Sequence, residues 1–327
     1  MRSPRRRGCG RTITIPILRS GILARKFCRA GACAEVVAVF ERSLYLRCAD
    51  MFLCIGTPSI GNGPITMIGD FASASELSEF GLRPGLSVSI ADRCLTIAGS
   101  AQFSFDQYEV WRPSRWCVPR SHRELRSVCD AIVRLAAVEG PEEGLAQIYR
   151  LRERGTDPTP LARIARAHIA RFESWLSDAL ETHHTEPTTS RDAIEGLIGL
   201  GPGLTPSGDD FLVGALALLD ALAQRKAHAA LAHAIATAPR GLTSPLSDYL
   251  LRAAASGHVG EPLCRAVSAV ISGMADAAVA SLREIGHSSG WDMLVGVGSA
   301  LKVVAAARRA ALPVDEARCT ARRGGAE

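Results

Sequence analysis

The segment Ser-Gly-Asp-Asp at residues 207–210 follows a loop rich in glycine and proline, residues 199–206, and precedes an apolar run. Serine is a preferred N-cap, and a carboxylate three positions later completes a capping box, so the pattern predicts a helix beginning at Ser207. The first backbone N–H groups of a helix lack intrahelical partners and lie at the positive end of its dipole. Such a helix start suits a carboxylate, a phosphate or a polarised carbonyl oxygen. The predicted substrate-binding residues here are Gly203, Thr205, Ser207, Gly208 and Asp210.

The same pattern recurs 82 residues later (289 minus 207), where residues 289–296 repeat the Ser, Gly, second Asp, Leu, Val and last Gly of residues 207–214. This offset occurs only once and is too long for a solenoid period. We interpret the two copies as helices with the same kind of start, which face one pocket if they pack side by side. This second copy adds Ser288, Ser289, Gly290 and Asp292 to the predicted substrate site.

Asp209 and His287 are the predicted catalytic residues. Asp210 and Asp292 share the capping position, which leaves Asp209 to act as a general base or to accept a hydrogen bond from a substrate amino group. His287 adjoins the second copy, where an imidazole could exchange protons. The alternatives are a capped helix connection and a solvated histidine. A Mg²⁺ ion shared by Asp209 and another carboxylate is the remaining option, but no third acidic residue has matching spacing, so we predict no cofactor.

Two further residues are predicted to bind substrate. Asn62 stands between glycines directly before a predicted strand, and Ser244 lies in a hydroxyl-rich segment, residues 243–247. The alternatives are a tight turn for Asn62 and a helix N-cap for Ser244. Arg240 and Lys302 are candidate anion clamps that no motif supports.

Known phosphate and nucleophile motifs do not explain residues 199–210. Gly203 and Gly208 have the spacing of a phosphate-binding loop, but Asp209 and Asp210 stand where Lys and Ser or Thr are needed. This loop holds neither a dinucleotide fingerprint nor a Gly-x-Ser-x-Gly segment.

The composition argues against nucleic-acid and membrane partners. The 327 residues carry a net charge of +5, with only 5% aromatic residues, and many of the arginines lie near the two ends. A nucleic-acid footprint needs a basic face with interleaved aromatics, and no uncharged apolar stretch reaches about 18 residues. The ten cysteines show no CxxC pair, which favours reduced thiols and a cytoplasmic protein.

The hydrophobic periodicity changes near Trp111–Pro119 from short β-like segments to helical stripes. We therefore predict an α+β fold, with a small N-terminal antiparallel β-rich domain followed by a larger, mainly α-helical bundle. The predicted parts are a disordered basic arm (1–30), the β-rich domain (31–112), the helical domain (113–312) and a tail (313–327).

Several segments together resemble a bacterial family long catalogued as a domain of unknown function, whose better-known branch is called AllH. They are the glycine-rich segment 199–214, Asn62-Gly63-Pro64, and segments 243–251, 257–262 and 286–292. The resemblance covers roughly residues 35–310 and implies a subunit of oxamate carbamoyltransferase, an enzyme of allantoin and purine degradation. That activity belongs to a multi-subunit enzyme, so the resemblance also implies partner subunits and a small anionic substrate.

The implied reaction is reversible carbamoyl transfer, in which oxalurate and phosphate give oxamate and carbamoyl phosphate. Helix N-terminal amides could stabilise charge on the carbamoyl oxygen, and Asp209 could assist the weakly nucleophilic oxamate nitrogen. The alternative is a non-catalytic subunit that binds a small carboxylate or serves as a scaffold.

Overall fold

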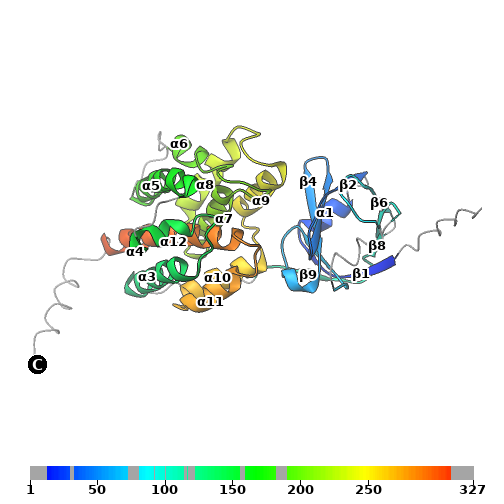
Figure 1. Cartoon of the computed structure of the whole chain (residues 1–327), viewed down its shortest axis with the longest axis horizontal. Helices are drawn as coiled ribbons and strands as arrows, with labels where there is room; N and C mark the ends of the chain where they lie inside the picture. Colours follow the sequence, from blue (N-terminus) through cyan, green and yellow to red (C-terminus); the bar gives the residue numbers. More distant parts are fainter. Residues whose placement is uncertain are drawn as a thin grey trace, which may run out of the picture. The chain divides into compact units, whose positions relative to one another are not determined.

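The computed structural model describes residues 13–310 except for 30–32, 73–80, 92, 100, 114–115, 117–121, 155–158 and 182–189. The chain forms two compact units, residues 1–114 and 115–327. The first holds the strands and the second holds the long helices (Figure 1). The predicted α+β fold, with a β-rich part followed by a mainly helical part, is confirmed.

The β unit is a barrel of eight strands with a ninth strand attached to it. The strand order is β5-β4-β3-β2-β6-β7-β8-β1-β9, and a further pairing between β5 and β1 closes the ring. Residues alternate between core and solvent along β2 and β3, as strands with one buried face require. The strands are β1 (Ile13–Gly21), β2 (Ala34–Val39), β3 (Ser43–Cys48), β4 (Met51–Gly56), β5 (Thr66–Gly69), β6 (Ser87–Ala91), β7 (Cys94–Ile97), β8 (Ala101–Ser104) and β9 (Glu109–Trp111).

Two expectations for this unit need correction. The sheet is mixed rather than antiparallel, because β1 runs parallel to β8 and β9, and β4 runs parallel to β5. Residues 13–29 of the predicted disordered arm form β1 and a short helix, α1 (Ala24–Arg29). Ile15, Ile17 and Phe27 are buried there, and burying these side chains supplies the free energy that orders the segment. Residues 1–12 and the tail 313–327 lie outside the described residues.

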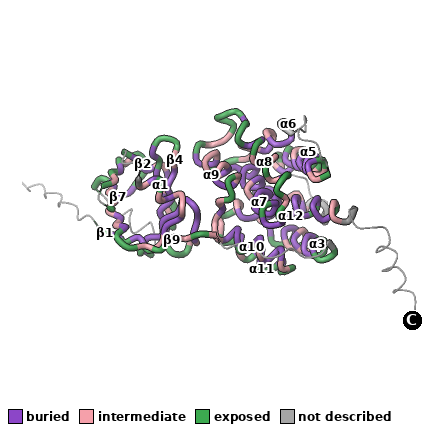
Figure 2. The backbone as a smooth tube through the Cα atoms, turned by 180° about the vertical axis from the view of Figure 1, so that it is seen from behind, coloured by how far each residue is buried: buried purple, intermediate pink, exposed green. Residues whose placement is uncertain are grey.

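The helical unit is built around two neighbouring helices, α7 and α12. Both lie at the centre of the unit with other helices around them (Figure 1), and their residues are mostly buried (Figure 2). The helices are α3 (His122–Glu139), α4 (Gln147–Arg154), α5 (Pro160–Glu181), α6 (Ser190–Glu195), α7 (Ser207–Ala221), α8 (Arg225–Thr237), α9 (Pro245–Ala255), α10 (Glu261–Ile271), α11 (Ala275–Leu282) and α12 (Ser289–Ala310).

Burial explains the unusual composition of α12. Residues Ser289–Arg308 are long and apolar enough to cross a membrane by composition, but 78% of that window is buried inside the structure. A helix that is apolar on all sides suits the core of a bundle. The helix that contains the second copy of the repeated segment is therefore a central core helix.

Candidate functional site

The carboxylate of Asp209 joins three segments of the helical unit. Its Oδ1 accepts a hydrogen bond from the backbone N–H of Gly199 at 2.9 Å. Its Oδ2 accepts from the hydroxyl of Thr243 and from that of Ser247, the latter at 2.7 Å. Asp209 is only 1% exposed. It therefore fixes the glycine-rich loop, residues 199–206, against the segment that leads into α9.

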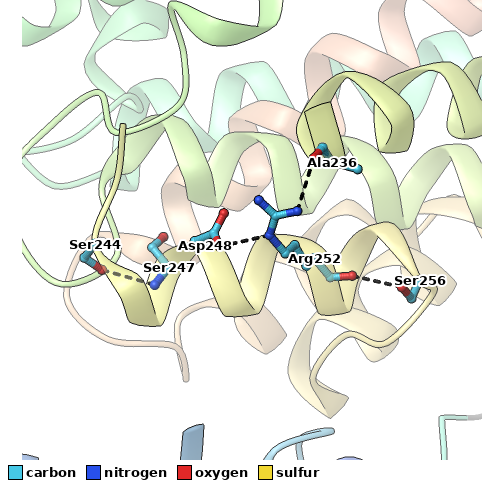
Figure 3. Close-up of polar contacts among 6 residues, drawn as sticks. All are labelled: Ala236, Ser244, Ser247, Asp248, Arg252 and Ser256. Carbon is cyan, nitrogen blue, oxygen red and sulfur yellow. Dashed lines mark hydrogen bonds and ion pairs between the residues drawn. The ribbon is translucent and has the colours of Figure 1, made fainter. Parts of the chain in front are cut away.

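Ser244 is the N-cap of α9. Its hydroxyl accepts a hydrogen bond from the backbone N–H of Ser247 at 3.1 Å and donates one to the carbonyl of Leu204 at 2.5 Å. Figure 3 shows the cap, and one turn later Asp248 pairs with Arg252 at 2.9 Å. The N-cap alternative for Ser244 is confirmed, and the same hydroxyl holds the exposed part of the glycine-rich loop beside α9.

The repeated segments interact reciprocally at the starts of α7 and α12. The hydroxyl of Ser207 on α7 hydrogen bonds to the carboxylate of Asp292 on α12. The hydroxyl of Ser289 on α12 in turn hydrogen bonds to Asp210 on α7. We call these four side chains the crossed pair. Equivalent positions of the two copies thus exchange partners, as residues related by a twofold axis do.

The last glycine of each copy allows the two helices to touch. A methyl group at Gly214 would lie 2.1 Å from the carbonyl oxygen of Met293, and one at Gly296 would lie 1.9 Å from that of Phe211. Gly214 and Gly296 are equivalent in the repeat, and so are Phe211 and Met293. The approximate twofold relation therefore extends about one turn beyond the crossed pair.

Four backbone N–H groups at the two helix starts are already hydrogen bonded within the chain. Gly208 donates to Leu200 at 2.8 Å, and both Asp209 and Asp210 donate to Pro206. At α12, Gly290 donates to Ile285 at 3.1 Å. These four N–H groups are thus not free for a ligand.

The capping box expected at the start of α7 is wrong. The N-cap of α7 is Pro206, without a side-chain cap, and Ser207 is the first helical residue. The reason is that the Ser207 hydroxyl turns to Asp292 on the neighbouring helix, where it satisfies a buried carboxylate. Asp210 likewise faces Ser289 instead of reaching back to its own helix start.

Burial raises the pKa of all three carboxylates. That of Asp292 rises to about 6 despite hydrogen bonds from the Leu145 N–H, at 2.6 Å, and from two serine hydroxyls. The pKa of Asp210 rises well above its ordinary value, through burial first and then through the neighbouring aspartates. Asp210 Oδ2 has no hydrogen-bond partner in the described part of the chain. The pKa of Asp209 also rises by burial, and its three donors oppose the shift.

The loops that lead into α7, α9 and α12 contain the predicted site residues that are more exposed. The hydroxyls of Thr205 and Ser289 lie 3.2 Å apart, so the glycine-rich loop reaches the start of α12. Gly203 and His287 are exposed, and Ser288 is half-buried. The loops 199–206, 241–247 and 286–289 therefore form one rim, with the buried aspartates beneath it.

Asn62 lies in the β unit, where it is buried beside a tight turn closed by the Thr66 N–H and the Gly63 carbonyl at 3.1 Å. Its grouping with the helical residues stays a prediction. Sequence reasoning did not place Thr243, Ser247 and Leu145 among the site residues, although all three bind the central aspartates. Only the run of hydroxyl residues after Gly241 signalled the first two. Among the described residues, no group of three His, Cys, Asp or Glu side chains could hold a metal ion.

Comparison with known families supports the resemblance expected from the sequence. Residues 197–301 match the family described as oxamate carbamoyltransferase subunit AllH. The match includes the glycine-rich loop, Asp209 and its partners, and both helix starts. No solved structure matches the chain.

Proposed function

We propose that this chain is a subunit of an oxamate carbamoyltransferase and that the rim formed by loops 199–206, 241–247 and 286–289 faces the substrate. The family match over residues 197–301 carries the proposal, because these residues include all three loops and the buried aspartates that hold them together. The other subunits are protein partners in a hetero-oligomeric cytoplasmic enzyme, without a nucleic-acid or membrane partner. The seven cysteines in the described part of the chain are free thiols, which suits a reducing compartment.

The reaction transfers a carbamoyl group between nitrogen and phosphate oxygen. When phosphate attacks the carbamoyl carbon of oxalurate, a C–O bond forms, the C–N bond breaks, and the departing oxamate nitrogen takes a proton. In the reverse direction a base removes that proton. His287 is the better candidate for this proton transfer, because its side chain is exposed whereas both oxygens of Asp209 accept hydrogen bonds.

Asp209 then acts as a positioning residue. It joins the glycine-rich loop to Thr243 and Ser247, and so fixes the hydroxyl groups of the rim in place. Preorganised hydroxyl and amide groups can stabilise the charge that develops on the carbamoyl oxygen. Arg240 immediately precedes the second loop and is exposed, so it is the candidate cation for the phosphate.

The test uses the chain copurified with its native partner subunits, with phosphorolysis of oxalurate measured as carbamoyl phosphate formed. We expect His287→Ala to lower kcat about 100-fold, the usual range for loss of a general acid or base. His233→Ala is the matched control, since His233 is also exposed but lies on α8, and it should leave kcat unchanged. Equal kcat values for both variants would remove His287 from the mechanism.

A non-catalytic scaffold or carboxylate-binding subunit is the second candidate function. The observation that favours it is that the N–H groups of residues 208–210 and both oxygens of Asp209 already form hydrogen bonds inside the chain. If the chain is a scaffold, Asp209→Ala should release partner subunits in size-exclusion chromatography, while His287→Ala and Arg240→Gln should leave kcat unaltered. A catalytic subunit predicts loss of kcat in both latter variants, with the complex intact.

A further inference from the structure

A cavity of about 140 Å³ lies between α3, α4, α5 and α12, apart from the rim described above. Its walls are largely apolar, with Val133, Ile148, Ile169 and Val295 among the lining side chains. A cavity of roughly 150 Å³ with apolar walls can hold a benzene ring. The space therefore suits a compact apolar group of about that size.

Charged side chains of α5 and α12 also line this cavity. Lys302 Nζ pairs with Glu173 Oε2 at 2.6 Å, which balances one positive and one negative charge. Arg166 lines the same cavity and adds one further positive charge. The described lining thus has a net charge of +1, which complements a ligand with a single negative group.

The cavity is connected to the crossed pair through α4 and α12. The N–H of Leu145, just before α4, donates to Asp292 Oδ1 at 2.6 Å. Ile148 on α4 and Val295 on α12 then line the cavity, one turn beyond these two residues. Asp292 therefore fixes the position of one cavity wall relative to the other.

We propose that this cavity is a second ligand site for a compact monoanion with an apolar body, such as an aromatic or branched aliphatic carboxylate. Oxamate does not meet this description, because a carboxylate and an amide leave it without an apolar group to contact the walls. The site thus lies beyond the proposed carbamoyl transfer, and its occupant contacts the helix that bears Ser289 and Asp292.

The test is thermal unfolding of the full chain with benzoate, benzyl alcohol, benzylammonium and oxamate, each titrated separately. A ligand that binds only the folded chain raises the midpoint, by about 3 °C at roughly ten times its dissociation constant. We expect benzoate to bind at least about tenfold more tightly than the other three, which lack either the negative charge or the apolar body. No benzoate-dependent shift, or an equal shift with benzylammonium, would overturn the proposal.

Substitutions in the lining locate the bound benzoate. Ala170 is exposed and lines the cavity, so Ala170→Trp should fold and abolish the benzoate shift. Arg166→Gln should weaken benzoate binding about tenfold, while Glu173→Gln should strengthen it several-fold. Arg163→Gln is the matched control, because Arg163 is exposed on α5 but does not line the cavity. Equal losses in the Arg163 and Arg166 variants would place binding elsewhere and overturn the proposal.

Discussion

The two copies of the repeated segment agree at their serine, first glycine and second aspartate but differ at the third position, Asp209 on α7 and Trp291 on α12. The shared serine and aspartate side chains make the crossed pair. At the position that differs, Asp209 binds three donors from neighbouring loops, whereas Trp291 is a buried aromatic side chain.

Residues of the two copies thus have two kinds of role within one sequence pattern. Positions found in both copies hold the two helices together, because each serine hydrogen bonds to the aspartate of the other copy. Asp209, which the second copy replaces with Trp291, organises the glycine-rich loop. No equivalent of this loop precedes α12. A similar sequence therefore does not imply two equivalent binding sites. The proposed rim is asymmetric, whereas the contact between α7 and α12 is nearly symmetric.

The largest effect should come from breaking the symmetric contact itself. In Gly296→Ala the new methyl group would lie 1.9 Å from the Phe211 carbonyl oxygen, so α7 and α12 must move apart. We expect the free energy of unfolding in urea to fall by about 3 kcal/mol or more. Gly298→Ala on the same helix is the control, since its methyl group would approach the end of the Tyr149 side chain at 2.9 Å and would lie no closer than 3.8 Å to Ile132. Similar losses in both variants would argue against a special role for the helix crossing.

The second effect depends on pH and comes from the buried carboxylates. Asp292 has an ordinary pKa of 3.8 and a folded-state pKa of about 6, so folding takes up a proton between these values. Its contribution to stability is therefore greatest below about pH 4 and falls as pH rises to about 6, by roughly 3 kcal/mol at most. The difference in unfolding free energy between wild type and Asp292→Asn, measured from pH 4 to 7, should show this slope. A difference independent of pH would mean that Asp292 ionises normally in the folded chain.

Most of the secondary structure could be predicted from the sequence, because the spacing of apolar residues differs between a strand and a helix that each bury one face. The strand at Ile13–Gly21 was missed because Pro16 and Arg19 interrupt its apolar run, although Ile15 and Ile17 alternate correctly. The parallel pairings of β1 and β4 could not be foreseen, since strand order depends on contacts between residues distant in the chain.

The sequence singled out Ser207, Asp210, Ser289 and Asp292 but not the contacts between them. Ser207 and Asp210 have the spacing of a capping box, yet they bind side chains on the other helix. A local rule cannot reveal this exchange, because it depends on how closely α7 and α12 approach at their glycines. The cavity beside Lys302 had no sequence signal either, as its walls come from four separate helices.

A third test concerns the position at which the two copies differ. Asp209→Ala should leave the Gly199 N–H and the Thr243 and Ser247 hydroxyls without their acceptor, and lower the unfolding free energy by about 2 kcal/mol. The glycine-rich loop should also become a site of limited proteolysis. Asp209→Asn, which keeps one carbonyl oxygen, should show a smaller loss, and a larger loss than in the alanine variant would contradict the assigned role.

The smallest effect should reveal the symmetry of the crossed pair most directly. Ser207→Ala and Ser289→Ala each remove one hydroxyl from a buried aspartate, so each should lower the unfolding free energy by about 1 kcal/mol. Because the pKa values of Asp210 and Asp292 both depend on this pair, the double variant should differ from the sum of the single variants. Strictly additive losses would show that the two hydroxyl–carboxylate contacts act independently. Ser281→Ala, on the exposed side of α11 with its hydroxyl bonded to its own helix, is the control and should change little.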